Sequence, residues 1–197
     1  MFDPPYVFQA KCSRLIKLKF YVLFSELPAK RNSDEEFEFD LFLSCSRENS
    51  TYVQEYLIPL LESEPFNLKV CYHHRDFELG QDIIQNMANA VYNSRKILVV
   101  ISDNYLASEY CLYEMNVALN REVTEKFPCL AFIRRNNMKK NLPVKLKTKN
   151  FLDLSNDLEQ KFINKRLKSF LRELCKDLEN EKNTMNDEQS AAMLKGV

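Results

Sequence analysis

The residues of this chain best placed to do chemistry are a glutamate and an aromatic residue on one predicted helix. Tyr110 and Glu114 stand four residues apart, so they share one face of the helix that Ser108 is expected to cap. That helix follows the strand predicted over 97–101, and small ligands in open α/β sheets bind beyond the carboxyl ends of the strands. Three serines also belong at this edge: Ser44, Ser46 and Ser102. The pattern predicts a ligand crevice there, with Glu114 and Tyr110 beside the three serines.

A second candidate site is the connection that follows the strand predicted over 67–72. It combines a cation, two acids, two large apolar side chains and a glycine: Arg75, Asp76, Phe77, Glu78, Leu79 and Gly80. Because connecting loops run over the surface, apolar side chains there are candidates for binding a partner. We expect Arg75 and Asp76 to brace the loop internally, and Phe77, Glu78 and Leu79 to form the interface. The alternative is that Phe77 or Leu79 packs on the core.

Alternating strand and helix signals from residue 37 onward predict the scaffold that positions these residues. They favour a flavodoxin-like, doubly wound α/β domain, a parallel sheet of about five strands with helices on both faces. Strands are predicted over 39–44, 67–72, 97–101, 127–133 and 151–154. Helices are predicted over 50–61, with a kink at Pro59, over 83–91, from Ser108 to about Asn120, and from Asn156 or Asp157. The last helix is expected to bury six residues: Leu158, Phe162, Leu167, Phe170, Leu171 and Leu174.

The chain of 197 residues divides into one domain over 37–176 and two flanking segments. Residues 1–36 form a basic and aromatic segment with a linker, and its uncharged apolar runs are too short to span a membrane. Interleaved basic and aromatic residues over 11–24 suit an anionic membrane surface, or an amphipathic element that packs on the domain. Residues 177–197 are polar and charged without apolar periodicity, so a disordered tail is expected.

Composition excludes several classes of function. The 28 basic and 28 acidic residues cancel, which argues against nucleic acid as the main partner. With only two glycines, the chain lacks both common phosphate-binding loops, and no cofactor is expected. The six cysteines have no paired spacing and only two histidines accompany them, so they are interpreted as buried thiols rather than disulfides or metal ligands.

One basic run lies between the last two predicted strands. It comprises Arg134, Arg135, Lys139, Lys140, Lys145, Lys147 and Lys149. Such a run is usually a solvated surface, and docking of an acidic partner or an anionic lipid is the alternative.

Three segments in order carry a resemblance to a known family: FDLFLSCS over 39–46, LKVCYHHRDFELG over 68–80, and SRKILVVISDNYLASEYCLYE over 94–114. Together they resemble the Toll/interleukin-1 receptor (TIR) domain family, whose first-strand, loop and third motifs recur at similar spacing. The resemblance covers about 37–175. The stretch RLIKLKFYVLF also looks like the segment that follows the membrane span in Toll-type receptors, so the chain is most similar to the cytoplasmic tail of such a receptor.

The resemblance implies a signalling interaction module on the cytosolic side of a membrane, whose partners are other TIR domains, both its own copies and adaptors. It identifies residues 75–80 as the loop through which such domains contact one another, the BB loop. The alternative that it implies is a hydrolase with NAD as substrate, in which Glu114 acts beside an aromatic residue. Leu79 and Tyr110 depart from the family pattern, which has proline and tryptophan at these places.

Overall fold

The computed structural model describes residues 37–126, 128–135, 138, 142–147, 149, 151–154 and 164–180 of the chain. The predicted basic and aromatic segment and the residues after 180 therefore lie outside the described part, as do Leu158 and Phe162. Among the described residues, no helix is both long enough and apolar enough to span a membrane.

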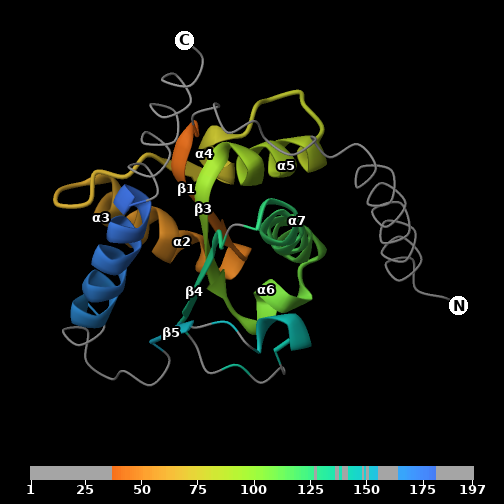
Figure 1. The fold of residues 1–197 in the computed structure, drawn as a ribbon. Helices are drawn as coiled ribbons and strands as arrows, with labels where there is room; N and C mark the ends of the chain where they lie inside the picture. The colour runs from red at the N-terminus through yellow and green to blue at the C-terminus, as the bar shows by residue number, and fades with distance from the viewer. Residues whose placement is uncertain are drawn as a thin grey trace, which may run out of the picture. The chain divides into compact units, whose positions relative to one another are not determined.

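Five parallel strands form one sheet in the order β2-β1-β3-β4-β5 (Figure 1). The strands are β1 (Phe39–Cys45), β2 (Val70–Tyr72), β3 (Ser94–Ile101), β4 (Leu130–Arg134) and β5 (Phe151–Asp153). This is the strand order of flavodoxin-like folds. The chain first adds β2 on one side of β1 and then β3, β4 and β5 on the other, so the topological switch point lies between β1 and β3. The predicted doubly wound α/β fold is confirmed.

Helices cover both faces of this sheet. Along the chain they are η1 (Arg47–Asn49), α2 (Ser50–Tyr52), η2 (Val53–Leu57), α3 (Ile58–Glu62), α4 (His73–Asp76), α5 (Ile83–Asn93), α6 (Asp103–Ala107), α7 (Glu109–Glu125), η3 (Val144–Leu146) and a helix over 164–180. Figure 1 shows α2, α3 and the helix over 164–180 on one side of the sheet, and α5, α6 and α7 on the other.

The core follows the alternation of side chains along the strands. Leu43 and Leu98 point to the face where the helix over 164–180 packs, and they share a buried cluster with Leu57 and Leu171. All eight residues of β3 are buried, because this strand is central and both of its faces are covered.

The irregularity expected at Pro59 takes the form of a wider helical turn. Residues Val53–Leu57 are π-helical, and the N–H of Ile58 donates to the carbonyl oxygen of Val53. Proline has no N–H, so it cannot donate the hydrogen bond that an α-helix would form at residue 59. A single π turn just before the proline shifts the hydrogen bonding of the helix by one residue.

Several predicted boundaries are corrected by single residues. The strand predicted over 67–72 begins only at Val70, because Asn67 adopts a left-handed conformation with φ of 47°. The helix predicted to end near Asn120 continues to Glu125, where Lys126 ends it with φ of 55°. The strand predicted over 127–133 begins at Leu130.

The carboxyl-terminal helix is longer than predicted. It continues through residue 180, and Leu178 is only 2% exposed within the core cluster. Leu178 extends the helical spacing of Leu167, Leu171 and Leu174, so it meets the same face of the sheet. The polar tail expected from residue 177 therefore does not start there.

Candidate functional site

Glu114 lies inside the domain, on the face of α7 that meets the sheet. The helix begins where the side chain of Ser108 accepts a hydrogen bond from the backbone N–H of Cys111, at 3.3 Å. Glu114 is 4% exposed, and the hydroxyl of Ser44 in β1 donates to the Oε2 atom of its carboxyl group. Burial raises the pKa of Glu114 to about 8, against the opposing effect of the Ser44 hydrogen bond. The side chain is therefore mostly a neutral acid at pH 7.

Tyr105 completes this buried network. Its hydroxyl lies 2.7 Å from the hydroxyl of Ser44, and its ring is fully buried. Burial raises the pKa of Tyr105 well above its ordinary value, so the phenol stays protonated. A chain of hydrogen bonds thus runs from Glu114 in α7 through Ser44 in β1 to Tyr105 in α6.

The other two predicted serines meet beside this network. The hydroxyls of Ser46 and Ser102 lie 3.3 Å apart, and the amide of Asn49 donates to both. Ser102 also caps α6, because its hydroxyl accepts from the backbone N–H of Tyr105 at 3.1 Å. The structure therefore brings Ser44, Ser46 and Ser102 to one edge of the sheet, as predicted. These side chains are buried rather than lining an open crevice: Ser46 bonds Ser102, whereas Ser44 bonds Glu114 and Tyr105.

Tyr110 and Glu114 both belong to α7, but they differ in exposure. The side chain of Tyr110 is 42% exposed, whereas Glu114 is buried, so the aromatic residue of the buried network is Tyr105 instead. Sequence reasoning missed Tyr105 because α6 has only five residues, too few for apolar periodicity. The available signal was Ser102, a capping residue directly after the buried strand.

In the loop after β2, Arg75 and Asp76 act as internal braces, as predicted. They belong to the short helix α4 rather than to an open loop. Asp76 accepts a hydrogen bond from the backbone N–H of Tyr72 at 2.6 Å and pairs with Arg75 at 2.9 Å. Arg75 also pairs with Glu62 of α3 at 2.8 Å. These contacts tie the start of the loop to β2 and to α3.

The three residues predicted to form the interface separate into different roles. Phe77 is half-buried, and its ring stacks on buried Phe42 with centroids 6.4 Å apart, so the alternative of core packing holds for this residue. The backbone carbonyl of Glu78 accepts a hydrogen bond from Asn86 of α5 at 3.0 Å. Leu79 is fully exposed. Gly80 follows it with φ of +86°, a conformation that L side chains rarely adopt.

The basic run between β4 and β5 is partly engaged in contacts within the domain. Arg134 pairs with Asp153, and Lys149 pairs with Glu122. The guanidinium of Arg135 lies 3.9 Å from the ring centroid of Tyr52. These three cations therefore help to hold the domain together, whereas Lys139, Lys140 and the side chain of Lys145 lie outside the described part.

Four cysteines of the described part are thiols inside the core. Cys45, Cys71, Cys111 and Cys129 are buried, as predicted, and burial raises the pKa of each to about 12. Such thiols are unreactive at neutral pH. Within the described ranges, no three histidine, cysteine, aspartate or glutamate side chains lie close enough to hold a metal ion.

Comparison with known proteins supports one family. A family model described as the TIR domain matches residues 41–171. Toll-like receptor 4 of Pinctada imbricata is 34% identical over 146 residues, which cover 71% of this chain and 16% of that receptor. Protein toll of Drosophila melanogaster is 33% identical over 92 residues, covering 47% of this chain and 8% of that protein. The chain therefore spans less than a fifth of the length of these relatives.

Solved structures agree at the level of the fold. The TIR domain of a Toll-related receptor from Hydra magnipapillata superposes with a TM-score of 0.57 at 18% identity, over 69% of this chain and 98% of that one. A metazoan TIR-STING receptor from C. gigas gives a TM-score of 0.53 at 20% identity, over 77% of this chain and 42% of that one. With the family match and the parallel sheet, these findings lead to one conclusion. The chain belongs to the TIR domain family.

Proposed function

We propose that this chain is an intracellular signalling module that associates with its own copies and recruits TIR-containing adaptors in innate-immune-type receptor signalling. The family match and the Toll-like receptor relatives support this class of function. On this proposal the domain works on the cytosolic side of a membrane, and residues 11–24 contact the anionic membrane surface. The observation that carries the proposal is the exposure of Leu79.

Leu79 is presented on a loop whose two ends are fixed. On one side, Asp76 is bonded to β2 and Phe77 stacks on the core. On the other side, Asp82 caps α5 by accepting from the N–H of Ile84 at 2.9 Å. An apolar side chain held in this way loses little conformational freedom on binding, so burying it against a partner is a net gain.

The experiment that tests this proposal measures self-association of the purified chain by sedimentation at increasing concentration. Leu79→Asp should weaken association at least about tenfold, because a partner would have to bury an unpaired charge. The matched control is Val123→Asp, since Val123 is another apolar side chain, 78% exposed, on α7. Equal association of wild type and Leu79→Asp, with native circular dichroism in both, would place the interface elsewhere.

A second candidate function is hydrolysis of NAD, with Glu114 stabilising positive charge at the ribose as nicotinamide leaves. The observation in its favour is the raised pKa of Glu114, because strongly perturbed carboxyl groups gather at functional sites. The charge stabilisation itself needs the ionised carboxylate, which is the minor form of Glu114 at pH 7. Against it stands the burial of Glu114, Ser44 and Tyr105, since a substrate would reach the carboxylate only after α6 or α7 moved.

Nicotinamide release by concentrated wild-type protein and by Glu114→Gln distinguishes the two candidates. We expect no release from either protein. Turnover by the wild type that falls about a hundredfold or more in Glu114→Gln would establish the enzyme. Turnover that is equal in both would come from a contaminant and would not involve Glu114.

A further inference from the structure

Four cations follow the outward face of the helix over 164–180. They form what we call the cationic stripe: Lys165, Lys168, Arg172 and Lys176, all of them exposed. At about 3.6 residues per turn, these positions fall within an arc of about 80°. Leu174, which is buried in the core, lies on the opposite side of the helix. The cationic stripe therefore points away from the sheet, and with a rise of about 1.5 Å per residue it is about 16 Å long.

The charge of the cationic stripe is not neutralised by the described part of the domain. None of its four side chains has a hydrogen bond or an ion pair with another described residue. The acidic residues Glu173 and Asp177 lie about 90° or more around the helix from the middle of the stripe. Arg172 stands four residues from both Lys168 and Lys176, and like charges at this spacing destabilise a helix. The arrangement therefore costs helix stability and favours an anion outside the domain.

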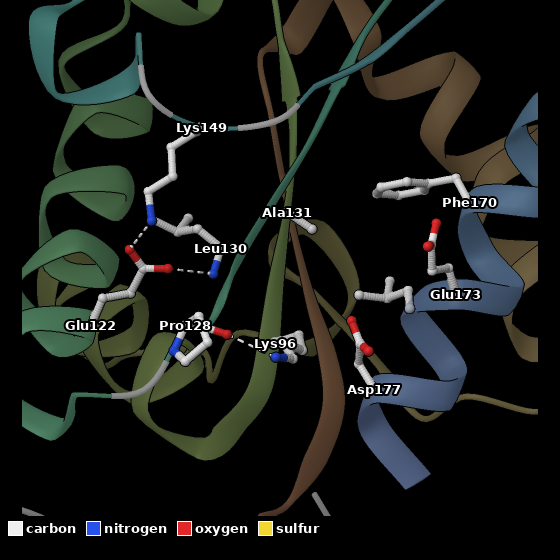
Figure 2. Close-up of a pocket in the computed structure, with 10 residues that line it drawn as sticks. Lys96, Glu122, Pro128, Leu130, Ala131, Lys149, Phe170, Glu173 and Asp177 are labelled. Carbon is white, nitrogen blue, oxygen red and sulfur yellow. Dashed lines mark hydrogen bonds and ion pairs between the residues drawn. The ribbon is translucent and has the colours of Figure 1, made fainter. Parts of the chain in front are cut away.

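The cationic stripe leads to the edge of the sheet where the chain enters the domain. Phe39 and Ser94, the first residues of β1 and β3, are paired in register. Lys96, near the start of β3, and Asp177, near the end of the helix, line one cavity (Figure 2). The end of the helix therefore lies at the edge where β1 begins. The segment that precedes β1 includes residues 11–24, which are proposed above to contact a membrane, and it joins the domain at this edge.

We propose that the cationic stripe docks on the anionic surface of a membrane, an inference that rests on the proposed function for placing the domain there. A straight row of exposed cations matches a flat layer of phosphate and carboxylate headgroups, and each cation near such a surface raises the affinity about fivefold. The ammonium groups of lysine need no fixed geometry for this contact. The guanidinium of Arg172 can bond one phosphate through two N–H groups.

Docking in this way leaves the loop that carries Leu79 uncovered. The cationic stripe belongs to the face of the sheet that α2, α3 and the helix over 164–180 cover (Figure 1). The loop leads from β2 to α5, which covers the other face. A domain held by the stripe and by residues 11–24 therefore presents Leu79 to other copies on the same membrane.

Co-sedimentation of the full chain with vesicles of phosphatidylcholine, with and without phosphatidylserine, tests the docking. Lys168→Gln/Arg172→Gln removes two charges from the middle of the stripe and should weaken binding to the anionic vesicles at least about tenfold. The matched control Arg47→Gln/Lys126→Gln removes two exposed cations outside this helix, so the net charge is the same, and it should bind as wild type does. Wild-type affinity in Lys168→Gln/Arg172→Gln, or an equal loss in the control, overturns the proposal.

A further double variant separates the stripe from the membrane contact of residues 11–24. Lys17→Gln/Lys19→Gln removes two charges from that segment. Loss of binding in this variant alone overturns the stripe and supports the segment. Loss in Lys168→Gln/Arg172→Gln alone supports the stripe without the segment, provided that the melting temperature is no lower than that of wild type, as the removal of like-charge repulsion predicts. Equal binding of wild type to both kinds of vesicle overturns both contacts.

Discussion

Glu114 is a carboxyl group that the fold keeps largely uncharged. Its partner is the hydroxyl of Ser44, which also lies against Tyr105, and no cation contributes to its pKa shift. A protonated carboxyl inside such a network links α7 to β1 without the large cost of a buried charge. The geometry therefore gives Glu114 a structural role in the resting domain.

The free energy of unfolding should depend on pH through Glu114. Its pKa is about 8 in the folded protein against an ordinary value of 4.5, so between these values the folded state binds one more proton than the unfolded state. The contribution of Glu114 to the free energy of unfolding is therefore complete below pH 4.5. It is lost as the pH rises toward about 8, by on the order of 1 kcal/mol per pH unit. Glu114→Gln has no charge to gain and should flatten this slope.

Urea unfolding between about pH 5 and pH 8 measures this effect. Glu55→Gln is the control, because Glu55 is exposed in η2 and its replacement should leave the slope unchanged. A slope in Glu114→Gln equal to that of wild type would show that the carboxyl group is ionised in the folded state.

At the scale of elements, apolar patterns in the sequence were sufficient to predict the sheet but not where its elements end. Buried strands such as β3 stand out as uninterrupted apolar runs, since both faces are covered. The ends depend on single backbone conformations, such as the left-handed Asn67 and Lys126, which no apolar pattern reveals. The predicted serines do meet, but their burial depends on how the short α6 packs over them, and periodicity cannot show that.

Phe77 and Leu79 should respond differently to truncation, although they are two residues apart. Phe77→Ala removes a ring stacked on Phe42 and should lower the free energy of unfolding by about 1–3 kcal/mol. Leu79→Ala removes only exposed atoms and should change it by less than about 0.5 kcal/mol. Chemical denaturation measures both. Unchanged stability of Phe77→Ala together with lost association would assign Phe77 to the interface after all.

The carboxyl-terminal helix offers a comparable pair of changes around its end. Leu178→Ala should destabilise the domain by about 2–4 kcal/mol, because this side chain is almost fully buried in the core cluster.

Removal of residues 181–197 should leave the melting temperature nearly unchanged, since that sequence offers no apolar periodicity. A fall of many degrees on truncation would show that the segment packs on the domain.

At the scale of the whole molecule, the proposed association depends on one apolar side chain, Leu79, which this α/β domain displays on a loop held at both ends. A contact of this size is weak between single copies and gains strength when several copies are held together. On the proposed function, clustering of receptor tails would supply the local concentration that this contact needs.

The most direct test uses membrane-anchored copies of the chain that an added dimeriser clusters. It measures how much of a second copy, tagged with a fluorescent protein, is recruited to these clusters. Wild type and Glu114→Gln should recruit the tagged copy equally, because association does not need the carboxyl group of Glu114. Leu79→Asp should fail at equal expression and with native circular dichroism, whereas Val123→Asp should recruit normally. Full recruitment by Leu79→Asp, or loss of recruitment in a folded Glu114→Gln, would contradict the claim that this domain acts through the Leu79 loop rather than through Glu114.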